Sequence, residues 1–290
     1  MNTGAQLLVA LAAMSWGLVG IWSRQLTAAG FTFAEMVAIR GAVTAIFLFI
    51  FLFFTAREQI KIRLKDLGLL FCMGGLGVAV CMMCYFHTME TITLSTASIL
   101  LYTSPYMVML LSALVFKEKI TLQKLCALLI AFSGCVMTLG IAEHTNLPLS
   151  GVMTGLTAAF LYSTYTIFGK IAMRRCSPLT ASAYSYGIAM LVLLPFCNPG
   201  KMIAIAGADS ANIVNILFFG LLCTLLPAIC YMTGLKKLEP SRVAIIAFIE
   251  PLTAAVAGIV VFDELLSLAK IAGIAMIFFA LIVLNWKGRR

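Results

Sequence analysis

The chain of 290 residues is 62% hydrophobic and only 11% charged, and its formal net charge is +9. Soluble domains carry about a quarter of charged residues and about half of apolar ones, so this composition excludes an ordinary soluble protein. The basic residues stand in short clusters between apolar runs, as membrane topology signals do. Their placement therefore argues against nucleic-acid binding in spite of the positive charge.

Ten apolar runs follow one another along the chain, separated by short polar breaks. A helix needs about 20 apolar residues to cross about 30 Å of hydrocarbon, and the runs come near that length. No basic residue precedes the first run, which predicts a retained span and not a secretory signal. The predicted spans cover residues 5–23, 33–54, 67–87, 94–115, 122–140, 150–169, 180–197, 213–234, 242–261 and 268–286.

Lysines and arginines gather in every second loop, whereas the alternate loops hold only Arg24, Lys201 and Lys270. Cytoplasmic loops carry an excess of these residues. We therefore expect the clustered side to be cytoplasmic, with both termini inside and the chain in the cytoplasmic (inner) membrane. The clusters are Arg57, Lys61, Arg63 and Lys65; Lys117, Lys119 and Lys124; Lys170, Arg174 and Arg175; Lys236, Lys237 and Arg242; and Lys287, Arg289 and Arg290.

The nine cysteines lie mostly inside apolar runs, where they are expected to pack as small apolar residues and not to form disulfides. Cys81 and Cys84, followed by His87, have a spacing that metal ligands can have on a helix. Thiols within spans far more often serve packing. We expect no metal site and no cofactor.

The chain matches itself at a constant shift of 146 residues. The stretch "ASILLYTSPYMVMLLSALVFKEKIT" aligns with "VAIIAFIEPLTAAVAGIVVFDELLS". The same shift serves spans two to five, which is hard to obtain by chance. Identical pairs are Gly41/Gly187, Gly74/Gly220, Cys84/Cys230, Tyr85/Tyr231, Ser95/Ser241, Ile99/Ile245, Pro105/Pro251, Phe116/Phe262, Glu118/Glu264 and Lys124/Lys270.

This shift predicts two copies of one unit, residues 1–145 and 146–290. Each copy holds five predicted spans, and because five is odd, the second copy must enter the membrane in the opposite sense. The expected fold is therefore an all-α polytopic membrane protein whose ten transmembrane helices form two inverted five-helix repeats. Such repeats build transporters with a site near mid-membrane, exposed to each side in turn. The chain has no Walker A loop, so we expect no ATP drive within it.

The duplicated five-span unit, the "SP…FKE" and "EP…FDE" stretches, and Arg40 in "IRGAV" resemble the EamA family of the drug/metabolite transporter superfamily. The resemblance covers about residues 5–286. It implies a ten-helix inverted-repeat carrier that moves amino acids, related metabolites or amphipathic drugs, often outward. Ser104 stands in the first copy where Glu250 stands in the second, so the acid-proline pair occurs once.

Glu250 and Pro251 stand together in the ninth span, and Pro105 occupies the matching position of the fourth. Proline breaks the helical hydrogen-bond ladder, which is tolerated where a span lines a cavity or is packed by neighbours. We expect both prolines to act as helix breaks with a gating role. An ionisable group about 12 Å into a span normally faces the bundle interior. Glu250 is predicted to line the cavity, while a structural role that rigidifies the break stays open.

Arg40 lies in the second span and is always charged. It is a candidate to hold a substrate carboxylate or to pair with Glu250 or Glu35. The alternative, a structural role at a helix crossing or a side chain that reaches the interface, is favoured slightly, because a buried arginine needs permanent partners.

Aromatic residues recur at equivalent positions of the two copies. Trp16 matches Tyr162 and Tyr85 matches Tyr231, while Tyr102 lies just before Pro105. Aromatic rings around a central site can stack on an apolar group or surround a cation. An interfacial belt is the alternative. We include Trp16, Tyr85, Tyr102, Tyr162 and Tyr231 with Arg40 and Glu250 as candidate substrate-binding residues.

Four further acids and bases carry less weight. Glu118 and Glu264 close their spans and are expected to cap or pair locally. His87 and Glu90 lie near the end of the third span, where proton handling is conceivable.

These features together predict a secondary active transporter for a small amphipathic metabolite, an amino acid or derivative, with export the expected direction. A carrier for a quaternary amine held by an aromatic cage and Glu250 is the main alternative. An enzyme is not expected, because His87 and His144 are the two histidines and form no HExxH pair. A channel suits the proline-broken interior less well. The expected partners are a small-molecule substrate and the lipid bilayer; proton coupling and a monomeric or homodimeric state both stay open.

Overall fold

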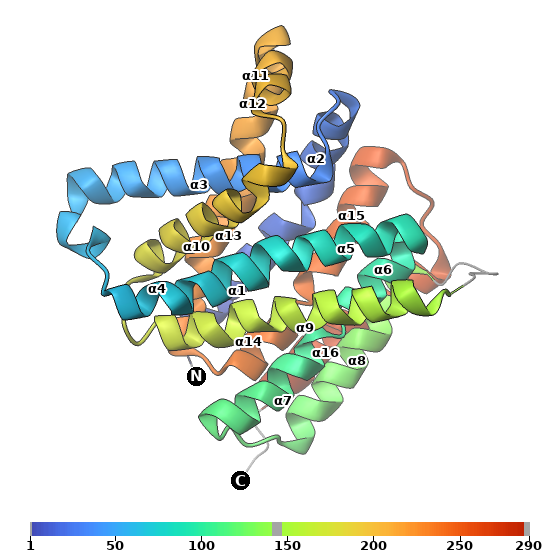
Figure 1. The fold of residues 1–290 in the computed structure, drawn as a ribbon. Coiled ribbons are helices and arrows are strands. Elements are labelled where there is room, and N and C mark those ends of the chain that lie inside the picture. The colour runs from blue at the N-terminus through green and yellow to red at the C-terminus, as the bar shows by residue number, and fades with distance from the viewer. Residues whose placement is uncertain (1, 141–146, 287–290) are drawn as a thin grey trace.

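The protein is almost entirely helical. The computed structural model describes residues 2–140 and 147–286, and within these ranges the chain forms helices joined by short turns, without a strand (Figure 1). The predicted all-α class is confirmed. His144 and the basic cluster of Lys287, Arg289 and Arg290 lie outside the described residues.

The helices of the chain follow one another in two series. The first series is α1 (Thr3–Gly17), α2 (Val19–Ala28), α3 (Phe33–Thr55), η1 (Arg57–Ile60), α4 (Leu64–Phe71), η2 (Cys72–Val80), α5 (Cys81–Thr91), α6 (Leu94–Leu101), α7 (Ser104–Phe116) and α8 (Leu122–Leu139). The second is α9 (Leu149–Ala172), α10 (Pro178–Leu193), η3 (Leu194–Phe196), α11 (Pro199–Ala208), α12 (Ser210–Gly220), η4 (Leu221–Leu225), α13 (Leu226–Lys237), α14 (Pro240–Ile246), α15 (Ile249–Phe262) and α16 (Leu268–Asn285).

Nine helical stretches in the described part of the chain are long and apolar enough to cross a membrane. One predicted span, 150–169, is not among those nine. It forms α9, which has 24 residues. The reason is its polar content, which faces protein: Ser163, Thr164 and Thr166 are all buried. Helix α9 packs against α5, α6, α7 and α13, so its polar face is covered by its neighbours. The chain is a multi-pass membrane protein.

Helix boundaries recur at the shift of 146 residues. Residues 64–91 and 210–237 each form a stretch with a π-helical segment in its middle, 94–116 and 240–262 each form a broken pair, and 122–139 and 268–285 each form one helix. Both broken pairs end in a non-glycine residue with left-handed backbone, Lys117 (φ 58°) and Asp263 (φ 51°). This conformation is rare for such residues. The two series therefore share local structure down to individual backbone angles.

Equivalent helices run in opposite directions where the two series meet. The hydroxyl of Ser241, at the start of α14, donates a hydrogen bond of 2.7 Å to Oε2 of Glu118, just after the end of α7. The end of the pair α6–α7 thus lies beside the beginning of its equivalent pair α14–α15. Figure 1 shows α3, α10, α5 and α9 side by side across the molecule, in agreement with their contacts.

Two glycines allow the helices around the centre to approach closely. A Cβ on Gly17, at the end of α1, would lie 2.6 Å from the carbonyl oxygen of Glu250 in α15. A Cβ on Gly77, in η2, would lie 2.8 Å from the backbone nitrogen of Tyr165 in α9. Because real Cβ atoms do not approach backbone so closely, both positions need glycine, and both bring α15 and α9 toward the middle of the molecule.

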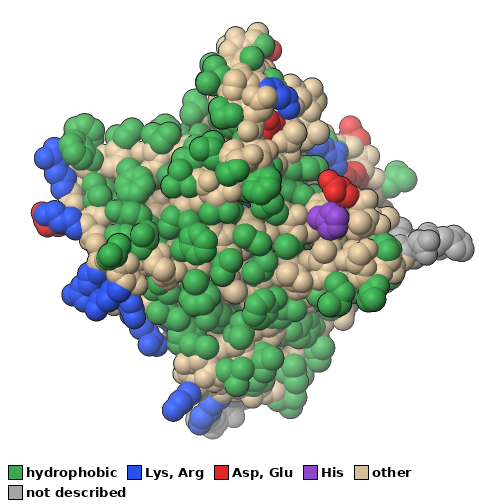
Figure 2. Space-filling view, in the orientation of Figure 1, with side chains coloured by type: hydrophobic (Ala, Val, Ile, Leu, Met, Phe, Trp, Pro, Cys, Tyr) green, Lys and Arg blue, Asp and Glu red, His purple; other side chains and the backbone are tan. Residues whose placement is uncertain are grey.

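The surface divides into an apolar middle and a basic end. Large apolar side chains of α3, α7, α15 and α16 are exposed, including Phe54, Leu114 and Val260. Figure 2 shows lysines and arginines gathered along the left and lower-left margin, with apolar side chains covering the face between. An exposed apolar band of this kind suits contact with lipid. The end that carries the clustered basic residues is called the basic end below.

Candidate functional site

The two broken helix pairs meet at their breaks. Helix α6 ends before Tyr102 and α7 begins at Ser104, while α14 ends at Ile246 and α15 begins at Ile249. The rings of Tyr102 and Phe248, one from each break, lie 6.1 Å apart between centroids. The breaks thus place backbone ends and polar side chains in the interior of the molecule.

Pro105 and Pro251 do not stand at the breaks but just after them, in the first turns of α7 and α15. A proline there costs little, because the first N–H groups of a helix have no partner within it. The carbonyl oxygen of Ala247, four residues before Pro251, is not left free, since it accepts from the backbone N–H of Glu250 at 2.9 Å. Each proline restarts a helix after the break.

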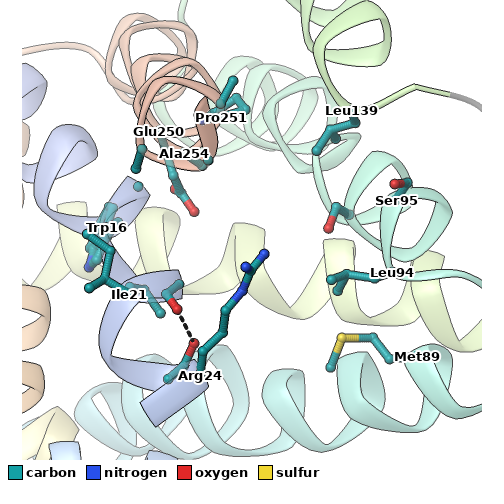
Figure 3. A pocket seen from close by; sticks show the side chains of 18 of the residues that line it. Trp16, Ile21, Arg24, Met89, Leu94, Ser95, Leu139, Glu250, Pro251 and Ala254 are labelled. Atoms are coloured by element: carbon teal, nitrogen blue, oxygen red, sulfur yellow. Dashed lines mark hydrogen bonds between the residues drawn. The ribbon is translucent and has the colours of Figure 1, made fainter. Parts of the chain in front are cut away.

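Glu250 lies in the first turn of α15 and is partly buried. The hydroxyl of Tyr102 donates a hydrogen bond of 3.2 Å to its Oε1. Its side chain borders a cavity of about 720 Å³. In Figure 3, Trp16, Glu250 and Ala254 form one wall, and Met89, Leu94 and Ser95 lie on the other.

A second cavity of about 230 Å³ adjoins the first, and both share several lining residues. Those lining both are Trp16, Val19, Arg40, Met82, Tyr85, Ser98, Tyr102 and Glu250. Tyr162 lines the smaller cavity, and Tyr231 lies with Tyr162 and Glu250 along a narrow cleft beside it. The structure therefore brings together all seven residues that the sequence singled out as substrate-binding candidates.

The aromatic rings form a connected group. Trp16 and Tyr231 lie 5.1 Å apart between ring centroids, and Tyr231 and Tyr165 lie 5.9 Å apart. The hydroxyl of Tyr231 shares a hydrogen bond of 2.7 Å with Thr166, and that of Tyr85 shares one of 2.8 Å with Ser98. These contacts hold the rings at fixed orientations around Glu250.

Two tyrosines that line the smaller cavity, Tyr165 and Tyr186, were not among the residues predicted from the sequence. Tyr165 follows Tyr162 by three residues in α9, a spacing that places both on one helix face. This signal was available. Tyr186 had no comparable signal, because it reaches the cavity through the packing of α10 against α3 and η2.

Arg40 lines both cavities, but it takes neither of the predicted acidic partners. Glu35 instead pairs with Lys201 at 3.2 Å and accepts from the backbone of Thr32 at 2.8 Å. Arg40 takes part in none of the ion pairs of the described residues, so it is not paired with Glu250 either. Its guanidinium lies 5.9 Å from the ring centroid of Phe219.

Glu118 and Glu264 pair locally as expected, but each also reaches another element. Glu118 is 3.9 Å from Lys124 and accepts from Ser241 in the second series. Glu264 is 3.0 Å from Lys270 and 3.4 Å from Arg24 in the first series. The hydrogen bond from Lys270 helps to hold the pKa of Glu264 below its usual value.

His87 and Glu90 form an exposed pair 3.5 Å apart on α5, and neither lines the two cavities. No group of three or more metal-ligating side chains occurs within residues 2–140 and 147–286.

A chain of membrane-spanning helices in two matching series, with a cavity between them, has the architecture of a membrane transporter. The model of the EamA-like transporter family matches twice, over residues 3–140 and 149–286. The chain belongs to this family, as the resemblance in its sequence indicated, and it is a transporter, not an enzyme.

Its relatives include an uncharacterized transporter of Archaeoglobus fulgidus, 27% identical over 77% of this chain and 79% of the relative. The uncharacterized inner membrane transporter YicL of Salmonella typhimurium is 22% identical over 97% of this chain and 95% of its own length. A third, a probable amino-acid metabolite efflux pump of Salmonella typhimurium, is 22% identical over 80% and 79%. A crystal structure of a protein that is 14% identical has the same fold, with a TM-score of 0.82 over 98% of this chain and 96% of that one.

Proposed function

We propose that this protein is a secondary transporter that exports a small amphipathic metabolite, an amino acid or derivative, across the cytoplasmic membrane by alternating access. The observation that carries the proposal is the position of Glu250, at a helix break in the interior, where it borders both cavities. Acids at such depth in membrane proteins mark substrate or ion pathways. That one relative is named as a probable amino-acid metabolite efflux pump supports the substrate class and the direction.

The shape of the larger cavity supports alternating access. Its lining includes Arg24, Glu264 and Lys270, which lie at the end opposite the basic end. At the basic end, Lys124 and Glu239 close the interior with an ion pair of 2.6 Å. With the basic end cytoplasmic, the described state is open outward, and the 1–145 and 146–290 copies exchange roles to open it inward.

Glu250 would then serve as the site where a proton and the substrate compete. The carboxylate has one hydrogen-bond donor in the described residues, Tyr102, and the cavity on its other side. A group placed in this way can release a proton when a cationic part of the substrate arrives. No cofactor enters this scheme.

A quaternary amine is the second candidate substrate. Its specific support is the group of rings around Glu250, since Trp16, Tyr102, Tyr162 and Tyr231 line the cavities that Glu250 borders. Rings at this spacing can surround a cation. Choline-like compounds should then bind, and amino acids should not.

The test is a substrate screen with purified protein in proteoliposomes, run with and without a pH gradient. We expect an amino acid or derivative to be transported, and Glu250→Gln to exchange that substrate without concentrating it. Glu90→Gln is the matched control, because Glu90 is exposed and lies outside both cavities. Concentration of substrate by Glu250→Gln at the rate of the wild type would exclude Glu250 from the coupling step.

A further inference from the structure

A second polar group stands in the 230 Å³ cavity, apart from Glu250. It consists of Arg40 from α3, Tyr165 from α9 and Tyr186 from α10. Glu250 and Tyr102 come from α15 and the end of α6. The same cavity is also lined by apolar side chains, among them Val78, Met82 and Leu101.

Two polar atoms of the second group have no hydrogen-bond partner in the described residues. The Nε atom of Arg40 and the hydroxyl of Tyr165 are both buried without a hydrogen bond to any described residue. Tyr165 as a whole is 3% exposed, and it is one of the residues that line this cavity. Buried polar groups are nearly always hydrogen-bonded, and an exception needs an explanation.

The charge of Arg40 makes this exception more costly. A guanidinium stays protonated, and in the interior of a membrane protein it normally faces an anion. Neither nearby acid supplies one here, because Glu35 is paired with Lys201 and Glu250 forms no ion pair. An anion that enters the cavity would meet a charged donor and a free hydroxyl at once, and such charge-assisted hydrogen bonds are the strong ones.

We propose that Arg40 and Tyr165 form a carboxylate-binding subsite, and that the substrate is a zwitterion whose ammonium group faces Glu250 and Tyr102. The inference rests on the proposed transport function and adds the chemistry of recognition. The apolar stretch between the two groups takes the body of the substrate. A cavity of about 230 Å³ suits a molecule smaller than a drug-sized ligand, whose sites take about 300–1,000 Å³.

The test uses compounds that differ only in charge. The twenty standard amino acids are first ranked by their shift of the thermal unfolding midpoint. The best of them is then compared with the amine that lacks its carboxylate and with the acid that lacks its amino group. We expect the amino acid to bind at least about tenfold more tightly than either, since each lost charge-assisted bond costs about that factor. Equal binding of the amine and the amino acid, or no shift by any amino acid, overturns the proposal.

Variants then assign the effect to the two residues. Arg40→Gln should weaken the amino acid about ten- to a hundredfold while leaving the matched amine unchanged. Tyr165→Phe, which removes only a hydroxyl, should show the same selectivity with a smaller loss and keeps the proposal testable if Arg40→Gln does not fold. Tyr184→Phe is the control, because that hydroxyl donates to the Ile60 carbonyl outside both cavities.

Two patterns would count against the subsite. Equal losses for the amino acid and the amine indicate a structural role for Arg40, and no loss for Tyr165→Phe removes that hydroxyl from the subsite. Failure of the proposed function looks different: the amino acid would bind selectively, but no movement across the liposome membrane would follow.

Discussion

The two ends of the molecule are built from equivalent residues in different arrangements. At the basic end, Ser241 donates to Glu118, and Lys124 lies 3.9 Å from the same carboxylate. The side chains of Lys124 and Glu118 are each 9% exposed. At the opposite end, their equivalents Lys270 and Glu264 still pair at 3.0 Å, but they are 22% and 39% exposed.

The serines show the difference most clearly. Ser241 bridges the two series at the basic end, whereas its equivalent, Ser95, lines the larger cavity together with Glu264 and has no hydrogen bond to it in the described residues. The equivalent groups are therefore more buried and bonded across the two series at the basic end, and more exposed at the opposite end. If the copies exchange conformations during transport, Ser95 is expected to donate to Glu264 when Ser241 releases Glu118.

The largest difference should appear when the lysines are neutralised. Lys124→Met leaves Glu118 without its cation in a buried place, and it also removes the 2.6 Å partner of Glu239. Breaking such a buried pair costs about 3–5 kcal/mol. The equivalent Lys270→Met breaks a pair that is 22% and 39% exposed, so its loss should be smaller and closer to the roughly 0–1 kcal/mol typical of surface pairs. Denaturant unfolding of the purified variants in detergent micelles measures both.

Equal losses of stability in the two lysine variants would contradict this comparison, because they would mean that both ends are equally closed. Lys61→Met is a further control, since Lys61 pairs with Glu58 in a fully exposed position on a loop. It should unfold as the wild type does.

The serines should give a smaller effect of the same kind. Ser241→Ala removes a donor from a buried carboxylate, and hydrogen bonds to charged groups contribute about 1.5–3 kcal/mol. Ser95→Ala should leave unfolding unchanged, because its hydroxyl has no carboxylate partner in this state. In transport assays, however, Ser95→Ala should slow turnover, because its hydroxyl is expected to donate to Glu264 in the other conformation. Normal turnover with Ser95→Ala would show that this serine does not close the end opposite the basic end.

Much of this architecture was predictable from the sequence. The repeat at 146 residues depends on local pattern, so it predicted helix boundaries well: the run 122–140 became α8 at Leu122–Leu139. The central residues were also predictable, because a mid-span acid and aromatic rings at equivalent positions of two copies converge when the copies face each other. Glu250, Trp16 and Tyr231 followed from that rule.

The partners of the charged groups could not be predicted in the same way. Glu118 bonds to Ser241 across 123 positions of the chain, and the equivalent Glu264 and Ser95 do not. The serine, the glutamate and the lysine are the same in both copies, so their local pattern does not distinguish the two pairs. The sequence also did not predict that Arg40 lacks an acidic partner. Glu35 was a candidate partner, but in the structure its carboxylate pairs with Lys201.

The smallest expected effect is the dependence of stability on pH that Glu264 causes at the end opposite the basic end. The hydrogen bond from Lys270, together with Arg24, holds the pKa of Glu264 below its usual value. A lowered pKa in the folded state adds stability above the unfolded pKa, and that stability is lost as the pH falls through the folded pKa. The window therefore lies below about pH 4.3.

Because Glu264 is 39% exposed, the contribution should stay below about 1 kcal/mol. We expect Glu264→Gln to lose a little less stability between about pH 5 and pH 3 than the wild type, since the neutral side chain has no charge to protonate. Unfolding midpoints across that range measure the difference. Salt should reduce this contribution of Glu264, because exposed ion pairs are screened. The contacts of Lys124 with Glu118 and Glu239 should respond less to salt. If salt weakened the ion pairs at both ends equally, Lys270 and Glu264 would have to be as shielded from water as Lys124 and Glu118.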